Sequence, residues 1–343
     1  MTSRLIPILC ATAAIAVAAA APVRADSVAD FYKGRQIDYN LATSAGGSWD
    51  VYLRVLSNYL GKYIPGNPKI VIQYMPGAGG VKALNYMYNA APKDGSYIGT
   101  PLATALLYAV LNPDKVKFLA PKFNWIGSMA RIQDVISVWA KGPIRTIEDA
   151  RKQEVKVGAT GRSSNSFLDI AMANNLLGTK FKPVLGYKGG AEIDLAIERG
   201  EVQGRANTWD GWAAAKPQWL TDRKIVHLVQ LGSSKLAEIG DVPLFGDLVK
   251  DPKDKQVVDF LSVGLAVGRS IYMPPGTPPE RVAALRQAFE KSMKDPAYVK
   301  EAKSRTLSTG DWKSGAEIQA VIDRTFNSPP DIVARAKAAL TLP

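Results

Sequence analysis

Three glycine-rich turns occupy the same kind of place in this chain, between a short apolar run and an amphipathic one. They are Ala45-Gly46-Gly47-Ser48, Pro76-Gly77-Ala78-Gly79-Gly80 and Tyr187-Lys188-Gly189-Gly190. Such a turn typically connects a strand to a helix, and the free N–H groups that begin the helix favour an anion. The turns therefore predict a mostly parallel α/β architecture and indicate capture of an anionic small molecule.

Apolar periodicity around these turns predicts two blocks of βα units and a helical C-terminal third. In the first block we expect strands at 37–41, 70–72 and 97–98, each of the first two followed by a glycine turn and a helix. The second block repeats this order. Its expected elements are strands at 155–159, 183–185, 202–207 and 225–231 and helices over 167–177 and 193–197, followed by C-terminal helices near 279–293, 316–326 and 332–340.

The two blocks predict two similar lobes. No Ser/Gly linker separates them, and the strand-like stretches 125–139 and 260–272 are the candidates for crossings. Two crossings would form a hinge. We therefore assign 26–130 together with 268–343 to the first lobe and 131–267 to the second.

The first 25 residues are typical of a secretory signal. Arg4 precedes an uncharged run over 5–21, and Val23-Arg24-Ala25 places small residues where cleavage after Ala25 needs them. An uncleaved anchor is the alternative, although the run is shorter than the ~20 residues of a membrane span. Cys10 lies inside this segment, so the mature chain would contain no disulfide and no thiolate metal site.

Charge and composition limit the possible partners. Without Arg4 and Arg24, 41 of the 43 basic residues remain against 31 acidic ones, a net charge of +10. The basic residues are dispersed, so we expect an anionic ligand and no nucleic acid. The single histidine, His227, lies in an apolar run and is interpreted as a hydrogen-bonded core residue. It provides no conventional zinc or Cys-His site, and no metal, cofactor or enzymatic activity is expected.

Two loops are the main candidates for contacts with the anion. In the first, glycines allow close approach of the backbone, and Ser48 can cap the helix. In the second, Thr160-Gly161-Arg162-Ser163-Ser164-Asn165-Ser166 gathers hydrogen-bond donors before a helix. Each has a plain structural alternative: a tight turn in which Asp50 complements the helix dipole, and a polar loop with an N-cap.

The other candidates come from the remaining turns. Gly77 and Ala78 belong to a loop that lacks the Gly-Lys-Ser/Thr ending of a phosphate loop and fails the dinucleotide fingerprint, so nucleotide binding is not expected. Arg205, Asn207 and Trp209 follow a strand and could line the same cleft, with Arg205 pairing with a carboxylate. A structural arginine and a core tryptophan are equally open.

At these turns the sequence resembles the extracytoplasmic solute receptors of the Bug family, the binding subunits of tripartite tricarboxylate transporters. Six motifs carry the resemblance in the family's order. They are Ala45-Gly46-Gly47-Ser48-Trp49-Asp50, Pro76-Gly77-Ala78-Gly79-Gly80, Pro92-Lys93-Asp94-Gly95-Ser96-Tyr97, Gly186-Tyr187-Lys188-Gly189-Gly190, Asp241-Val242-Pro243 and Pro274-Pro275-Gly276-Thr277-Pro278.

The resemblance implies an α/β, two-lobed periplasmic binding protein of type II (Venus-flytrap) with a two-strand hinge. It implies a periplasmic location, a small dicarboxylate, tricarboxylate or aromatic acid as ligand, and delivery to transporter membrane subunits. We expect a monomer. The implied clamp is formed by 45–50 and 160–166. The full set of expected ligand-binding residues is Ala45, Gly46, Gly47, Ser48, Trp49, Asp50, Gly77, Ala78, Thr160, Ser163, Ser164, Asn165, Ser166, Arg205, Asn207 and Trp209.

Two departures from the family pattern bear on the ligand. Many relatives have a histidine where this chain has Ser166-Phe167, and the region 205–212 differs from the common Asp-containing version. The ligand therefore cannot be transferred from a relative. The alternatives are a receptor of the same fold for signalling or scavenging, and a hydrolase that uses Asp50 and a serine.

Replacing Gly47 with valine or Ser164 with alanine is expected to weaken ligand binding measured by calorimetry. Each charge-assisted hydrogen bond lost from a loop costs about 1.5–3 kcal/mol. Unchanged affinity in both variants would show that the clamp lies elsewhere.

Overall fold

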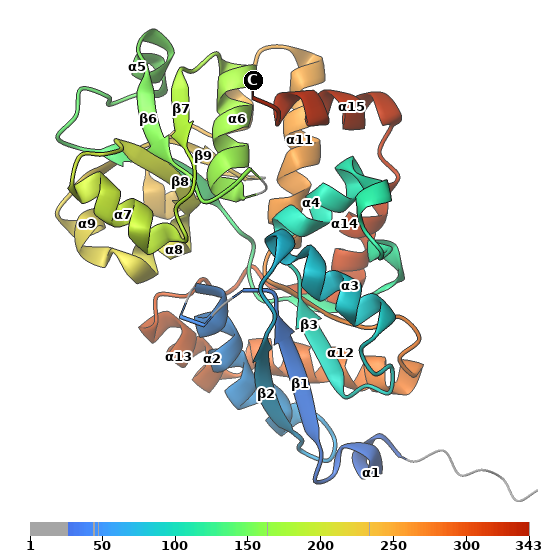
Figure 1. The fold of residues 1–343 in the computed structure, drawn as a ribbon. Helices are drawn as coiled ribbons and strands as arrows, with labels where there is room; N and C mark the ends of the chain where they lie inside the picture. Colours follow the sequence, from blue (N-terminus) through green and yellow to red (C-terminus); the bar gives the residue numbers. More distant parts are fainter. Residues whose placement is uncertain (1–26, 44, 47, 163, 233, 343) are drawn as a thin grey trace, which may run out of the picture.

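The computed structural model describes residues 27–43, 45, 46, 48–162, 164–232 and 234–342. The predicted signal peptide and Cys10 lie outside the described residues. Two β-sheets, each with helices on both faces, form two lobes (Figure 1). This is the α/β, two-lobed arrangement expected from the βα pattern.

The first lobe is built on a mixed sheet with strand order β11-β4-β10-β3-β1-β2. β1 pairs in parallel with β2 and β3, whereas β10 runs antiparallel to β3 and β4. The strands are β1 (Gln36–Leu41), β2 (Lys69–Tyr74), β3 (Tyr97–Thr100), β4 (Asn124–Ser128), β10 (Ser270–Met273) and β11 (Lys313–Ser314). The expected strands at 37–41, 70–72 and 97–98 are thus confirmed.

Alternating side chains divide the core of this lobe between the two faces of the sheet. On β10, Ile271 and Met273 join the cluster with α2 and α12, whereas Tyr272 joins the opposite cluster with α3, α4 and α14. Successive residues of a strand point to opposite faces, so a sheet covered on both sides needs apolar residues at every position. The helices of this lobe are α1 (Val28–Tyr32), α2 (Ser48–Tyr63), α3 (Val81–Asn89), α4 (Ala103–Leu111), α12 (Pro279–Lys294), α13 (Pro296–Ser304) and α14 (Gly315–Phe326).

The second lobe contains a sheet of order β7-β6-β8-β5-β9. β6 pairs in parallel with β7 and β8, and β5 runs antiparallel to β8 and β9. The expected strand at 225–231 is confirmed as β9. The elements are β5 (Asp134–Trp139), α5 (Ile147–Lys152), β6 (Val155–Gly158), α6 (Asn165–Leu177), β7 (Phe181–Val184), α7 (Gly190–Glu198), β8 (Gly204–Thr208), α8 (Trp209–Ala215), α9 (Pro217–Thr221), β9 (Ile225–Leu231) and α10 (Phe245–Leu248).

Two segments cross between the lobes and pair with each other. Met129 N donates to Arg269 O at 3.1 Å, and Arg269 N donates to Ala130 O at 2.8 Å. The first crossing joins β4 to β5, as expected. The second differs from the strand-like stretch expected at 260–272, because residues 260–267 belong to helix α11 (Pro252–Val267).

The helix at 252–267 has a clear physical cause. Asp251 caps its N-terminus by accepting hydrogen bonds from the backbone N–H groups of Lys253 and Asp254, and Pro252 stands at the first helical position. Val257, Val258 and Leu261 recur at helical spacing and are buried. A short apolar run does not by itself distinguish a buried helix from a strand.

The C-terminal helix α15 (Pro330–Ala339) packs on α11 and also reaches α6 of the second lobe (Figure 1). Ala336, Ala339 and Leu340 join the core cluster that contains Val155 and Val157 of β6. Asn175 Nδ2 of α6 donates to Ala339 O at 2.9 Å. The last helix therefore contacts both the crossing helix and the second lobe. The division of the chain at 130/131 and 267/268 stays a prediction.

A glycine in the middle of the second sheet provides a test of its packing. A Cβ at Gly204 would lie 2.1 Å from the backbone oxygen of Ser137 on the neighbouring strand. We expect Gly204→Ala to lower the free energy of unfolding by about 3 kcal/mol, because backbone atoms of Ser137 and Val138 on β5 must shift. Urea denaturation measures this change.

Gly246→Ala is the matched control, because the nearest atom to its added Cβ is 3.8 Å away. In helix α10 the extra methyl group should leave stability unchanged or raise it slightly. Equal midpoints for the two variants would contradict the packing described for β5 and β8.

Candidate functional site

The loops singled out in the sequence gather between the two sheets (Figure 1). β1, β2 and β3 of the first lobe and β6 and β8 of the second end at the edges where helices begin. β5 is antiparallel to β8, so its first residue, Asp134, pairs with Thr208 at the same edge. In open α/β sheets ligands bind outside the carboxyl ends of the strands. The candidate site is therefore the region between these edges.

The first loop, 45–50, is held in shape by Asp50. Gly46 has φ +89°, and its N–H donates to Asp50 Oδ2 at 2.9 Å. Asp50 also accepts hydrogen bonds from Tyr74 Oη at 2.6 Å and Arg54 Nε at 3.0 Å. Burial acts to raise the pKa of Asp50, but these hydrogen bonds outweigh it and hold the pKa below its ordinary value. The carboxylate thus fixes the turn.

The other residues of this loop differ in their surroundings. Ala45 and Gly46 are exposed. Gly47 lies outside the described residues, and of Ser48 only its place at the start of α2 is described. Trp49 faces the guanidinium of Arg269, which lies 4.7 Å from the centre of its ring.

Arg269 is a charged residue at the hinge that the sequence interpretation missed. It is fully buried, lies 4.1 Å from the ring centre of Tyr52, and forms an ion pair with Asp210 at the start of α8. Asp210 belongs to the second lobe and Tyr52 to α2 of the first. Arg269 therefore connects the first loop's helix, the second crossing and the second lobe.

The hydroxyl groups of the second loop bond mainly to one another. Ser164 Oγ donates to Gly161 O at 2.7 Å and lies 2.8 Å from Ser166 Oγ. Thr160 N donates to Ser166 Oγ at 3.3 Å. Ser163 lies outside the described residues. This network shapes the loop. The N-cap residue of α6, Ser164, makes no side-chain cap bond, and the N–H of Ser166 donates to Asn165 Oδ1 at 3.0 Å.

The second glycine turn has four consecutive residues with positive φ. Gly77, Ala78, Gly79 and Gly80 have φ values of 143°, 47°, 59° and 96°. Glycine adopts such values without a steric cost, which explains three glycines in this turn. The turn leads directly into α3.

A cavity of about 390 Å³ lies between this turn and the second loop. It contains two cations, Lys115 from the first lobe and Arg162 from the second, and no acidic side chain borders it among the described residues. We call it the cationic cavity. Its lining residues are Ala78, Gly79, Val81, Thr104, Ala105, Tyr108, Lys115 and Arg162.

Arg205 and Asn207 lie within β8, not after a strand as the sequence predicted, and only Trp209 follows it; the three side chains have different surroundings. Arg205 is buried, donates from Nε to Asp194 Oδ1 at 2.7 Å and lies over the ring of Trp212. Asn207 is partly exposed and is the second-to-last residue of β8. Trp209 borders a different cavity of about 280 Å³ and packs edge-on against His227 at 5.5 Å between ring centres.

His227 is paired with a serine on the neighbouring strand of the second sheet. Its Nδ1 lies 2.8 Å from Ser137 Oγ on the neighbouring strand. Ser137 is buried, and burial lowers the pKa of His227 to about 4. The Ser137 hydroxyl, with 1% of its exposure, is therefore shielded from solvent.

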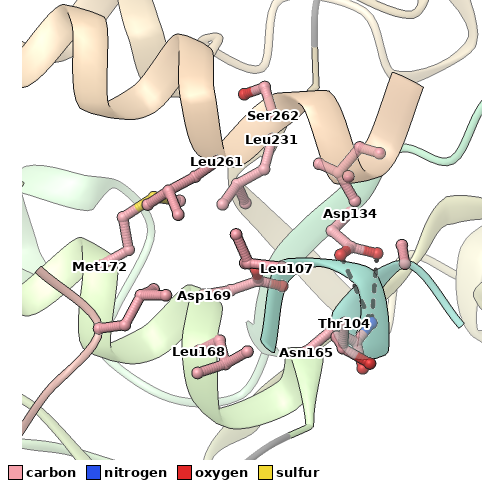
Figure 2. Close-up of a pocket in the computed structure, with 14 residues that line it drawn as sticks. Thr104, Leu107, Asp134, Asn165, Leu168, Asp169, Met172, Leu231, Leu261 and Ser262 are labelled. Atoms are coloured by element: carbon pink, nitrogen blue, oxygen red, sulfur yellow. Dashed lines mark hydrogen bonds between the residues drawn. The ribbon is translucent and has the colours of Figure 1, made fainter. Parts of the chain in front are cut away.

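Two buried carboxyl groups border a third cavity, of about 50 Å³ (Figure 2). Asp134 and Asp169 are joined by a hydrogen bond, and Asn165 Nδ2 lies 3.4 Å from both oxygens of Asp134. Burial raises the pKa of both carboxyl groups. We call this the acidic cavity. Its lining residues are Ala103, Thr104, Leu107, Asp134, Asn165, Leu168, Asp169, Met172, Leu231, Leu261, Ser262, Gly264, Leu265 and Leu340.

The sequence interpretation named Asn165 and Ala78 but missed Asp134, Asp169 and Arg269. The sequence does contain a signal for two of these residues: Asp134 and Arg269 are charged residues inside the apolar crossing stretches. A buried charge needs a partner, so each should have been regarded as part of a site or an ion pair. Asp169 had no such signal, because its place on α6 reads as an ordinary helix position.

Because His227 is the only histidine in the sequence, its pKa can be measured without interference from another imidazole. We expect the His227 imidazole to titrate near pH 4 by NMR, because burial disfavours its charged form. The folded state then binds fewer protons than the unfolded one, so this residue's contribution to stability is present above pH ~6.5 and is lost as the pH falls towards 4. His227→Gln should remove that part of the pH dependence, and a titration near pH 6.5 would contradict the burial described.

Comparison with known proteins identifies the family. The model of the "Tripartite tricarboxylate transporter family receptor" matches residues 53–325. A UPF0065 protein in the gbd 5′ region of Cupriavidus necator is 29% identical over 300 residues, covering 85% of this chain and 84% of that protein.

Solved structures share the fold. The periplasmic binding protein BugD matches with TM-score 0.66 and 18% identity over 90% of this chain and 98% of that one. MatC from Rhodopseudomonas palustris, solved with bound malate, matches with TM-score 0.66 and 17% identity over 90% and 99%. The two-lobed binding-protein fold and the resemblance drawn from the six motifs are therefore confirmed. The chain belongs to the receptor family of tripartite tricarboxylate transporters.

Proposed function

We propose that this protein captures a small carboxylate between its lobes in the periplasm and delivers it to the membrane subunits of a tripartite tricarboxylate-type transporter. It acts as a monomer, exported by a signal peptide that is cleaved after Ala25. MatC of the same fold was solved with malate, a dicarboxylate, which supports this class of ligand. The family consists of receptors, which supports binding without turnover.

The cationic cavity is the observation that carries the proposal. Lys115 and Arg162 approach it from different lobes, so a bound carboxylate would draw the two lobes together. Its volume of about 390 Å³ suits a small organic acid. The exposed positions of both cations also attract anions from solution.

Helix N-termini add hydrogen-bond donors to the same region. The N-cap residues of α3, α4 and α6 are Gly80, Leu102 and Ser164, and none of them makes a side-chain cap bond. The first N–H groups of a helix need an acceptor from outside the helix, and a carboxylate is a strong one. Ala78 and Asn165 therefore remain in the proposed site, at the starts of η1 (Ala78–Gly80) and α6.

Two of the expected residues are left out of the proposed site. Arg205 already has Asp194 as a buried partner, and Asp50 already accepts three hydrogen bonds. Releasing either from its partners would leave a buried polar group unsatisfied. Both are assigned to support of the lobes.

A thermal-shift screen with mono-, di- and tricarboxylates, aromatic acids and amino acids tests the proposal. A ligand that binds only the folded state raises the melting temperature by mass action. The acid with the largest shift is then titrated by calorimetry. The absence of a shift with every acid would overturn the proposed class of ligand.

Removing the positive charges of the cationic cavity tests whether the carboxylate binds there. For the acid selected, we expect the Lys115→Gln/Arg162→Gln double variant to bind about fivefold more weakly at low ionic strength, since exposed cations each contribute less than about 1 kcal/mol. The loss should shrink in high salt, because screening weakens exposed charges in the native protein as well. Lys300→Gln on α13 is the control, an exposed lysine outside the cavity. Equal losses in variant and control would place the anion elsewhere.

A further inference from the structure

The acidic cavity adjoins the cationic one. Thr104, in the first turn of α4, lines both. The two cavities therefore present opposite charge on the two sides of one residue at the junction of the lobes. This arrangement is unexpected for a site that binds only anionic groups.

One buried oxygen of the pair accepts no hydrogen bond from an N–H or hydroxyl group. Asp134 and Asp169 retain 1% and 8% of their exposure, and apart from the bond within the pair, Asp169 Oδ2 has no hydrogen-bond partner among the described residues. Both side chains point into the cavity, one from β5 and the other from α6 (Figure 2). A buried carboxyl oxygen without a donor is costly, so a donor from a ligand would satisfy it.

The charges around this pair leave it negative. The elements that face it contribute Asp134 from β5, Asp169 from α6, Asp210 from α8 and Arg269 before β10. The residues that α4, α11 and Leu340 add to the lining are uncharged. Three acidic side chains therefore face a single guanidinium. A cation entering the cavity is attracted, and an ionised carboxylate is repelled.

We propose that the acidic cavity receives the ammonium group of the ligand, so that the ligand is a short amino acid with its amine and its carboxylate at opposite ends. This inference rests on the proposed function, because the carboxylate of the same molecule occupies the cationic cavity. The ammonium group donates to the open oxygen of Asp169 and to Asp134. A cavity of about 50 Å³ accommodates an ammonium group with an adjoining methylene among leucine side chains.

Matched sets of ligands test the proposal by calorimetry on the mature protein. Each set contains an ω-amino acid, the monocarboxylate without the amine and the dicarboxylate of equal length. The sets are β-alanine, propionate and malonate; γ-aminobutyrate, butyrate and succinate; and ε-aminocaproate, caproate and adipate. In the set whose length fits, we expect the amino acid to bind at least about tenfold more tightly than both others, as a charged hydrogen bond provides.

Variants of the pair test the location. Asp169→Asn keeps the shape of the side chain but removes its ability to carry charge, and should abolish the preference for the amino acid. Asp134→Asn should also abolish this preference. It replaces the first variant in the test if the melting temperature shows that Asp169→Asn does not fold. Asp259→Asn, an exposed acid on α11, removes an equal charge outside the cavity and should leave the preference intact.

The outcomes separate this inference from the proposed function. Tighter binding of a monocarboxylate or dicarboxylate than of its matched amino acid overturns the inference and leaves the proposed function standing. The same holds if the amino acid is preferred but both pair variants retain the preference, or if an acid outside these sets is the only ligand found. Failure of every carboxylate to bind overturns the proposed function itself.

Discussion

The buried guanidinium of Arg269 is the interaction on which the junction of the lobes depends. It is fully buried in the second crossing, lies against the rings of Trp49 and Tyr52, and pairs with Asp210 of the other lobe. Removing one partner of a buried ion pair costs about 3–5 kcal/mol, because the other charge remains desolvated. The pair therefore fixes how the first loop, the hinge and α8 meet.

The charges at this junction are divided between two adjoining cavities. Lys115 and Arg162 border the cationic cavity, and Asp134 and Asp169 border the acidic one. Helix N-termini support the first, and burial among leucines makes the second sensitive to the charge of whatever enters. In the binding mode proposed above, the two cavities recognise opposite ends of one molecule, which a general attraction for anions would not achieve.

The fold was largely predictable because its signals are local. Apolar alternation at 37–41 and 225–231 predicted strands that form as β1 and β9, and helical spacing of apolar residues near 279–293 predicted α12. The exception was the stretch 260–272, most of which lies in α11. There, the apolar run by itself fits either element, and the Asp251 cap upstream together with packing against α4, α14 and α15 selects the helix.

The site was less predictable, since its residues come from distant parts of the sequence. The sequence by itself determined the βα order, the glycine turns and the family, because each depends on neighbouring residues. Only the tertiary structure decided that Asp50 and Arg205 have internal partners and that Asp134, Asp169 and Arg269 meet at the hinge. The physical reason is that the charge and hydrogen bonding of a buried group depend on which side chains face it across the lobes. A linear pattern does not contain that information.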